Sequence, residues 1–399
     1  MDELYDAITP ETEQFILERQ HDDVRTLALQ AKRYPGINMP VAIRQIAGRQ
    51  TAQHKIPSWY AAKGIIYPLH LSLEQCSSEL TARYKAGLLR GETLVDLTGG
   101  FGVDCAFLSA NFKQVTCIER QEELCNMAAH NFNILGLHQI VVVNKDSVEA
   151  LADLSPVDCI FIDPARRDEH GGKTVLVSDC EPDAEALEDM LLRKAGRVMI
   201  KLSPMLDLSL ALRSLPHTCE VHVVSVRNEC KELLLLLERR NAGTEKKEIP
   251  ICCVDLAGNG VRNFTFTRAE EASAVVSYTH EVDAFLYEPH ASILKAGAFR
   301  SVAARFGLKK LHPNSHLYTS DHLVDDFPGK AFCVQASSSN LKEIIAGVKR
   351  ATIVVRNFPV TVAGLRKRSK LREDGGLYLF ATTLHRGNKV YIMATKAAY

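Results

Sequence analysis

One stretch, Leu94–Asp104, constrains the fold of this chain more than any other feature. It reads as a buried strand that ends in an acid, Asp96, followed by a glycine-rich turn and the start of a helix. Alternation of strands and helices continues on its C-terminal side and predicts a parallel sheet covered by helices on both faces. A short polar turn before the last strand predicts a final antiparallel hairpin. Strands are expected near 94–97, 114–119, 139–144, 158–163, 197–202, 220–226 and 232–238, and helices near 102–111, 121–135, 182–194 and 205–214.

Three further regions flank this sheet. Residues 1–90 carry helix signals, among them the start Thr9-Pro10-Glu11, and a helix is expected from Ser72 to Leu89. The last part of the chain mixes strands with helices and predicts two small α+β units, the first preceded by a linker hairpin. The sequence therefore predicts an α/β protein with a helical region at 1–90, the sheet domain at 91–245, and α+β domains at 246–335 and 336–399.

Charge is unevenly distributed along the chain, although the formal net charge is zero. Between Lys349 and Tyr399 there are eleven Lys or Arg residues and only two acids, Glu373 and Asp374. A basic end on an otherwise acidic protein indicates a polyanionic partner, and a solvated basic helix is the alternative interpretation.

Cysteine usage and hydropathy bear on the compartment. The eleven cysteines are scattered and include no Cys-x-x-Cys pair, which argues against a zinc ribbon or a disulfide framework. The N-terminal Met1-Asp2-Glu3-Leu4 has no hydrophobic signal core, and no apolar run approaches membrane-spanning length. We expect a soluble cytoplasmic protein that binds neither a metal nor a membrane, and the sequence leaves the oligomeric state open.

The glycine-rich turn predicts a pocket for S-adenosylmethionine. Gly100 and Gly102 remove side chains where the methionyl part would pass, and Asp96 can bind its ammonium group. Glu119, at the end of the second strand, can accept hydrogen bonds from both ribose hydroxyls. The turn lacks the full G-x-G-x-x-G/A spacing of dinucleotide-binding proteins, so a dehydrogenase is disfavoured; a purely structural glycine turn is the other alternative. The residues expected to bind the cofactor are Asp96, Thr98, Gly99, Gly100, Gly102, Asp104, Glu119 and Asp146.

Asp163-Pro164-Ala165-Arg166 ends the fourth strand, at the edge where open α/β sheets bind ligands. It resembles the (Asn/Asp)-Pro-Pro-aromatic motif of amino-directed methyltransferases, in which the acid and the proline carbonyl accept hydrogen bonds from an exocyclic amino group. The third and fourth positions depart from that motif, and a salt-bridged turn is the alternative. Lys201, at the end of the fifth strand, faces the same edge as an anchor or a capping charge. We expect Asp163, Pro164 and Arg166 to be catalytic.

A cluster of cations near the C-terminus follows Phe358-Pro359 on an expected helix. Such a surface faces phosphates and binds nucleic acid without reading its sequence. A charged loop from Arg166 to Lys173 could close over a substrate or be an ordinary surface loop. The cations of the C-terminal cluster are Arg366, Lys367, Arg368, Lys370 and Arg372.

These segments together resemble a family of bacterial methyltransferases with a C-terminal THUMP-like domain. The resemblance covers nearly the whole chain and implies a Rossmann-like class I methyltransferase core, a ferredoxin-like insert around 277–335 and a THUMP-like, RNA-binding end. It makes Glu79, Tyr84 and Lys85 candidates for closing over cofactor or RNA, with a packing role equally open, and Arg167 a candidate for contact with RNA. It rests on Gln75–Lys85, Asp96–Asp104, Asp163–Arg167, Tyr287–His290 with Lys295–Gly297, and the basic C-terminal segment.

The sequence therefore predicts a methyltransferase that uses S-adenosylmethionine and modifies a base in structured RNA, either tRNA or rRNA. A methyltransferase that acts on a protein or a small molecule is the main alternative. A second alternative is an RNA-binding protein that binds S-adenosylmethionine without catalysing transfer.

Overall fold

The structure is a computed structural model and describes residues 8–166, 176–239, 247–257, 260–373 and 375–397. It contains two compact units. The first comprises Met1–Cys219 and Leu234–Thr244, and the second comprises Glu220–Leu233 and Glu245–Tyr399.

Helices precede the first strand, as the sequence predicts. The expected start at Thr9 is confirmed, because its hydroxyl accepts a hydrogen bond from the backbone N–H of Thr12 and Pro10 is the first helical residue. The helix expected from Ser72 to Leu89 is instead two helices, since Ser78 caps a new helix by accepting the N–H of Thr81. The helices of this region are α2 (Pro10–Glu18), α3 (Val24–Leu29), η1 (Ala31–Arg33), α4 (Met39–Lys55), α5 (Pro57–Ala61), α6 (His70–Gln75) and α7 (Glu79–Ala86).

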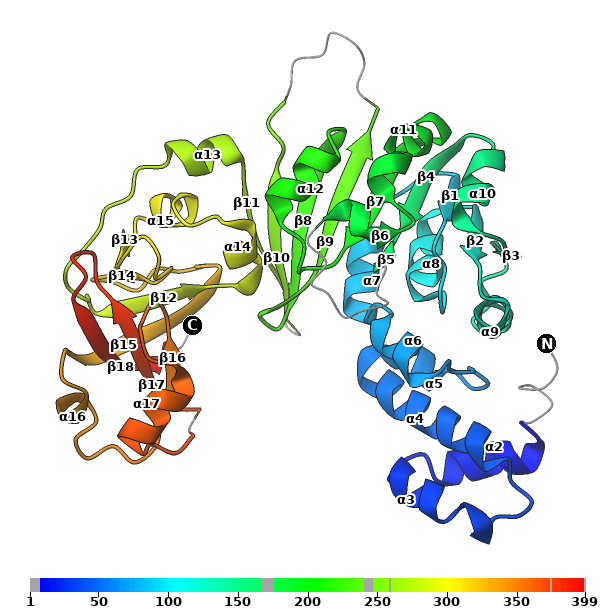
Figure 1. The fold of residues 1–399 in the computed structure, drawn as a ribbon, viewed down its shortest axis with the longest axis horizontal. Coiled ribbons are helices and arrows are strands. Elements are labelled where there is room, and N and C mark those ends of the chain that lie inside the picture. Colours follow the sequence, from blue (N-terminus) through cyan, green and yellow to red (C-terminus); the bar gives the residue numbers. More distant parts are fainter. Residues whose placement is uncertain (1–7, 167–175, 240–246, 258–259, 374, 398–399) are drawn as a thin grey trace. The chain divides into compact units, whose positions relative to one another are not determined.

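Parallel strands form the core of the first unit, in the order β3-β2-β1-β4-β7. Their carboxyl ends meet at one edge, and α7 lies beside α8 below it (Figure 1). The sequence missed α10, which follows β3. The strands are β1 (Thr93–Asp96), β2 (Gln114–Glu119), β3 (Ile140–Asn144), β4 (Val157–Ile162) and β7 (Ala195–Leu202), with a small pair β5 (Ala165–Arg166) and β6 (Cys180–Glu181). The helices are α8 (Val103–Leu108), η2 (Ser109–Asn111), α9 (Glu122–Ile134), α10 (Ser147–Asp153), η3 (Val177–Asp179), α11 (Ala184–Lys194) and α12 (Leu208–Ser214).

The predicted final hairpin consists of β8 (Thr218–Val226) and β9 (Glu229–Glu238). Its two turn residues, Arg227 and Asn228, have φ of 50° and 66°, the left-handed values of a tight hairpin turn. Among the described residues the sheet has nine strands, in the order β11-β10-β8-β9-β7-β4-β1-β2-β3. The expected linker hairpin, β10 (Ile251–Ala257) and β11 (Gly260–Phe266), is therefore part of this sheet and not a separate linker, because β10 pairs in parallel with β8.

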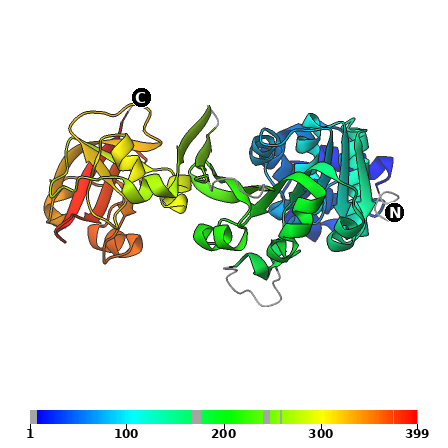
Figure 2. The ribbon, with the colours of Figure 1, turned by 90° about the horizontal axis from the view of Figure 1, so that it is seen from above.

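A second sheet forms the core of the second unit. Within the described residues its order is β13-β14-β12-β15-β18-β17-β16. The two predicted α+β units share this sheet, because β15 runs across their expected boundary at residue 335. Helix α17 packs beside β16 (Figures 1 and 2). The elements are α13 (Arg268–Ser273), β12 (Phe285–Pro289), α14 (Ala291–Ala296), α15 (Ser301–Arg305), β13 (Lys309–Lys310), β14 (Tyr318–Ser320), β15 (Gly329–Ser338), α16 (Leu341–Ile344), β16 (Thr352–Val355), α17 (Val362–Ser369), β17 (Leu377–Thr383) and β18 (Lys389–Lys396).

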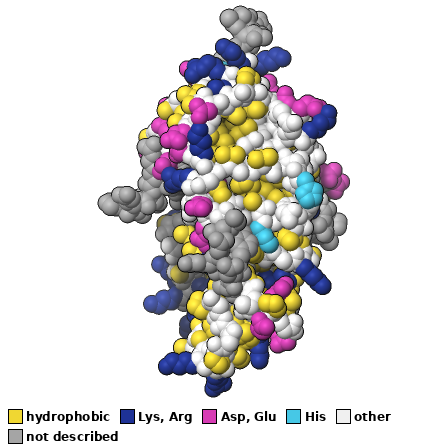
Figure 3. All heavy atoms as spheres, turned by 90° about the vertical axis from the view of Figure 1, so that its right-hand side faces the viewer, with side chains coloured by type: hydrophobic (Ala, Val, Ile, Leu, Met, Phe, Trp, Pro, Cys, Tyr) yellow, Lys and Arg dark blue, Asp and Glu magenta, His cyan; other side chains and the backbone are white. Residues whose placement is uncertain are grey.

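The surface of the first unit around the β3 edge carries mixed side chains. In Figure 3, lysine and arginine are interspersed with aspartate, glutamate and apolar side chains over this face. Val141, on the edge strand β3, is 61% exposed. This face therefore does not present a surface of one charge sign. In the described part of the chain, no helix has both the length and the apolar character needed to cross a membrane.

Candidate active site

The glycine turn links β1 to α8 at the carboxyl edge of the parallel strands. Gly99 and Gly102 are packing residues: a Cβ would lie 2.4 Å from Cys117 Sγ at the first and 2.6 Å from Phe132 Cζ at the second. Gly100 differs, because its φ is +53° and a Cβ there would meet no atom closer than 3.9 Å. The backbone at Gly100 thus borders open space, as close approach by a ligand requires.

Asp96 ends β1 and is 1% exposed. Its Oδ1 accepts a hydrogen bond of 3.0 Å from the backbone N–H of Thr98, and no hydrogen bond reaches Oδ2 from the described residues. Burial raises the pKa of Asp96 to about 8, and the neighbouring carboxylates of Asp104, Asp163 and Glu119 add to the rise. A cation beside such a buried carboxyl group stabilises its ionised form. The site therefore fits the ammonium and sulfonium charges of S-adenosylmethionine.

Glu119 ends β2 and ties the glycine turn to that strand. Its Oε2 accepts the N–H of Gly100 and its Oε1 accepts the N–H of Gln121, each at 2.8 Å. Each oxygen retains a further lone pair that can accept a hydroxyl group. The carboxylate expected to bind the ribose therefore lies directly against the open face of Gly100.

Asp146 follows β3 and caps α10. Its Oδ1 accepts the N–H groups of Val148 at 2.8 Å and Glu149 at 3.3 Å. Capping fixes this carboxylate at the carboxyl edge of the sheet, and its contact with adenine stays a prediction.

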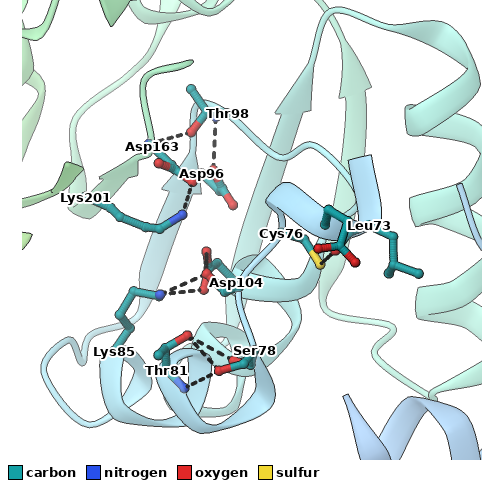
Figure 4. A network of polar contacts seen from close by, with 12 residues as sticks. Leu73, Cys76, Ser78, Thr81, Lys85, Asp96, Thr98, Asp104, Asp163 and Lys201 are labelled. Atoms are coloured by element: carbon teal, nitrogen blue, oxygen red, sulfur yellow. Dashed lines mark hydrogen bonds and ion pairs between the residues drawn. The ribbon is translucent and has the colours of Figure 1, made fainter. Parts of the chain in front are cut away.

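Asp104 lies in the first turn of α8 and is held by the N-terminal helices. Its Oδ2 accepts the Ser77 hydroxyl at 2.7 Å, and Lys85 Nζ lies 3.1 Å from its Oδ1 (Figure 4). Burial acts to raise the pKa of Asp104, but the ammonium groups of Lys85 and Lys201 and the Ser77 hydrogen bond outweigh it, so the pKa is lowered. The Lys85 side chain is 0% exposed and is a buried counter-charge to Asp104, which agrees with the packing role that the sequence leaves open. Tyr84, its neighbour, is half-buried.

Asp163 follows β4, which pairs with β1 on the side opposite to β2. Its backbone N–H donates to Thr98 Oγ1 at 2.7 Å, so the threonine hydroxyl joins the glycine turn to the end of β4. The Asp163 carboxylate forms an ion pair with Lys201, which lies at the end of β7 (Figure 4). Pro164, the next residue, is buried. These contacts bring Asp96, Thr98 and Asp163 together, as the sequence predicts.

Two predicted contacts next to Asp163 stay predictions. The backbone of Arg166 lies in β5, where it pairs with Cys180 of β6. Arg167 and the rest of the loop to Lys173 lie outside the described residues.

Comparison with known proteins identifies this arrangement. A crystal structure described as a candidate methyltransferase of Porphyromonas gingivalis W83 is 36% identical, with a TM-score of 0.87 over 97% of this chain and 98% of that one. The chain belongs to this methyltransferase family. An uncharacterised S-adenosylmethionine-dependent methyltransferase of Mycobacterium tuberculosis is 25% identical over 81% of this chain and 86% of its own length.

Family models match three parts of the methyltransferase. Residues 68–168 match the protein-L-isoaspartate(D-aspartate) O-methyltransferase model, 285–328 match a ferredoxin-like domain and 329–396 match a THUMP domain-like model. A protein-L-isoaspartate O-methyltransferase of Koribacter versatilis is 28% identical over 36% of this chain and 67% of its own length. The enzyme is an S-adenosylmethionine-dependent methyltransferase with an α/β core.

The basic segment of the methyltransferase is only partly helical. Arg366, Lys367 and Arg368 lie in the last turn of α17, Lys370 caps it with φ of 57°, and Arg372 follows the helix. Arg366 forms an ion pair with Glu373. The other four side chains are exposed and, within the described part of the chain, none of them forms an ion pair.

Two parts of the polar network go beyond the sequence analysis. For Lys201 the sequence leaves an anchor and a capping charge open, and the structure pairs it with Asp163. Ser77 and Lys85 were not recognised as partners of Asp104, because nothing in their spacing relates a helix before β1 to the first turn of α8. Both lysines lie among the carboxylates that surround the glycine turn (Figure 4).

Proposed function

We propose that this methyltransferase modifies a base in structured RNA, such as tRNA or rRNA. The match of residues 329–396 to a THUMP domain-like model supports RNA, because THUMP domains are RNA-binding modules. The observation that carries the proposal is the set of exposed cations Lys367, Arg368, Lys370 and Arg372 within that domain. Exposed cations that form no ion pair are available to phosphates, whereas a cation already paired on the protein must first lose its partner.

The proposed acceptor is an exocyclic amino group presented to Asp163. When bound, S-adenosylmethionine would supply a methyl group activated by the sulfonium charge; the S–CH3 bond would break as the N–CH3 bond forms, S-adenosylhomocysteine would leave, and the proton released from the nitrogen would pass to water. Asp163 accepts a hydrogen bond from the amino group together with the carbonyl of Pro164, which directs the nitrogen lone pair at the methyl group. Arg166 is the residue proposed to contact the nucleotide. Asp96 and Glu119 hold the methionyl and ribose parts of the cofactor, so acceptor and donor meet at one edge of the sheet.

A protein substrate has weaker support. The match to the isoaspartate methyltransferase model ends at residue 168, and it covers the strands and turns proposed to hold the cofactor. Asp163 lies within that match, whereas Lys201 of β7 and the whole second unit lie outside it. Methylation of protein is therefore an outcome of the test below rather than a parallel proposal.

The test uses RNA that lacks the modification. Total RNA from a strain without this protein and from its parent is incubated with the purified enzyme and radiolabelled S-adenosylmethionine. We expect label to enter RNA from the deletion strain, and much less label to enter parental RNA, whose sites are already methylated. Mass spectrometry of the nucleosides then identifies the base. If neither RNA were labelled and the label entered a protein fraction instead, the proposal would be overturned.

Asp163→Ala is the variant that separates methyl transfer from cofactor binding. It should abolish transfer and leave cofactor affinity near normal, whereas Asp96→Ala should weaken cofactor binding first. Loss of cofactor binding by Asp163→Ala to the same degree would show that Asp163 does not act on the acceptor.

A further inference from the structure

We propose that Lys201 is a positioning residue, which holds the carboxylate of Asp163 in the orientation and charge state that receive the methyl acceptor. The inference rests on the proposed role of Asp163 and extends it to a residue on a different strand. It follows from the strand register, the relative exposure of the two side chains and the charges that surround them.

The register of the sheet places the two residues side by side. β4 and β7 are parallel, and Ile162 of β4 is paired with Ile200 of β7. Asp163 and Lys201 each follow these paired residues, so they project from neighbouring positions at the carboxyl edge. Their ion pair therefore needs no loop to bring the groups together.

Two contacts determine the orientation of Asp163. Its backbone N–H is bound to Thr98 Oγ1, and one carboxylate oxygen, Oδ2, is bound to Lys201 Nζ. Among the described residues, no hydrogen bond is made to the other oxygen, Oδ1. An ionised carboxylate held at one oxygen presents the second as an acceptor in a fixed direction. That geometry is suited to an incoming N–H group.

Relative exposure indicates that Lys201 acts through Asp163. The Asp163 side chain is 34% exposed, whereas that of Lys201 is only 13% exposed. An acceptor that enters from solvent thus reaches the carboxylate first, with the ammonium group behind it. Lys201 is therefore placed to support Asp163 and not to bind the acceptor itself.

The surrounding charges explain why Asp163 needs a cation. The groups around this part of the site are the carboxyls of Asp96, Asp104 and Glu119, the ammonium of Lys85 and the thiol of Cys76. Lys85 is paired with Asp104. Removal of the Lys201 ammonium takes away the cation that favours an ionised carboxylate at this position, and only an ionised carboxylate accepts hydrogen bonds at both oxygens.

The first test does not depend on any methyl acceptor. Aspartate labelled with ¹³C at the carboxyl carbon is observed by NMR across a pH titration, and the Asp163 signal is assigned from its loss in Asp163→Asn. We expect the Asp163 titration to move to higher pH in Lys201→Met and to return towards the wild-type position in Lys201→Arg. An unchanged titration in Lys201→Met would overturn the proposal.

The second test is a double-mutant cycle for methyl transfer. Lys201→Met should lower the turnover number at least about 30-fold and leave the cofactor dissociation constant within about threefold, and Lys201→Arg should recover part of the rate. The acidic limb of the pH–rate profile should move to higher pH. The double variant Lys201→Met/Asp163→Asn should be no slower than Asp163→Asn alone, because both changes remove one function.

The cycle separates the possible failures. Additive losses would mean that Lys201 contacts the acceptor directly and would overturn the positioning role. Parallel loss of cofactor binding and stability would make Lys201 a purely structural group and would overturn it as well. Lys113→Met is the matched control, since it breaks an exposed ion pair with Glu92 near the start of β2 and should change neither readout. If wild-type enzyme labels no RNA, the proposed function fails while the NMR titration still decides the role of Lys201.

Discussion

The ammonium group of Lys85 lies 3.1 Å from Oδ1 of Asp104, and this pair joins α7 to the helix that follows the glycine turn. The lysine side chain is fully buried and the carboxylate is 10% exposed. Two charges removed from water in this way are tolerated only because each compensates the other. The N-terminal helices are thus attached to the cofactor site through a buried charge pair, and not through apolar packing alone.

Removal of one partner should therefore be costly. We expect Lys85→Met to lower the free energy of unfolding by about 3–5 kcal/mol, because Asp104 would be left buried without its main counter-charge. Urea unfolding followed by circular dichroism measures the change. The double variant Lys85→Met/Asp104→Leu should recover most of the loss, since replacement of both charges by apolar groups leaves no isolated charge.

An ion pair whose cation is exposed, on the same helix, provides the control. Arg83 lies 2.7 Å from Glu79; the arginine side chain is 59% exposed and the glutamate side chain 14%. Arg83→Met should cost no more than about 1 kcal/mol. If Lys85→Met were no more destabilising than Arg83→Met, the buried pair would not be what holds α7 in place.

Cofactor binding should release a proton from Asp96. In the free protein, burial raises the pKa of Asp96 to about 8, whereas a bound cation favours the ionised carboxylate. Affinity for S-adenosylmethionine should therefore increase as the pH rises towards about 8 and then level off. Titration calorimetry in two buffers with different ionisation heats measures the released proton directly. The same binding heat in both buffers at pH 7 would contradict the coupling.

Asp96→Asn tests the contribution of this one carboxyl group to stability and to cofactor binding. The folded-state pKa of about 8 lies above the ordinary value of 3.8, so the folded protein keeps a proton that the unfolded chain loses. The stability contributed by this group is fully present below about pH 4 and is lost as the pH rises to about 8. Asparagine has no such dependence, so Asp96→Asn should melt at a higher temperature than wild type at pH 8.5 while it binds the cofactor weakly. A lower melting temperature would show that ionised Asp96 is stabilised by contacts other than those described here.

The two left-handed glycines of the turn should respond differently to substitution. Gly102→Ala combines a φ of +88° with a Cβ 2.6 Å from Phe132, so we expect a loss of folding stability of at least about 2 kcal/mol. Gly100→Ala is strained only by its φ of +53° and should cost about 1–2 kcal/mol. It should nevertheless reduce cofactor affinity strongly, because its methyl group would enter the space proposed for the cofactor. Chemical denaturation and calorimetry distinguish the two; equal affinity losses at equal stability would contradict this division.

The parallel core was predictable because each strand is a short apolar run and each connection is local. Five parallel strands and the hairpin after them lie where alternation placed them. The sequence could not assign β10 to the same sheet, since β9 separates it in the sequence from its pairing partner β8. Helix α10 was missed because it is short, although Asp146 is a typical capping residue.

The position of a site residue was predictable where that residue ends or directly follows a single strand. Asp96, Glu119 and Asp163 each end or follow a parallel strand, and parallel strands bring such positions to one edge. Burial could not be read in the same way: Lys85 looks like an exposed helix cation in the sequence, but α7 turns it towards Asp104. Arg366 likewise reads as one of five equivalent cations, and only the structure distinguishes it by its pairing with Glu373.

That distinction gives the last prediction, on RNA affinity. Lys367→Gln, Arg368→Gln and Lys370→Gln remove exposed cations, and each should lower the slope of log affinity against log salt by about 0.7–0.9 if its side chain binds a phosphate. Arg366→Gln should change the slope less, because its charge is already balanced by Glu373. Filter binding to bulk tRNA at several salt concentrations measures the slopes. Lys32→Gln with Arg33→Gln, two exposed cations in the first unit, is the control and should change little. If all the cations contributed equally, including Arg366 and the control pair, binding would be a general charge effect and the THUMP-like domain would not be the RNA-binding surface.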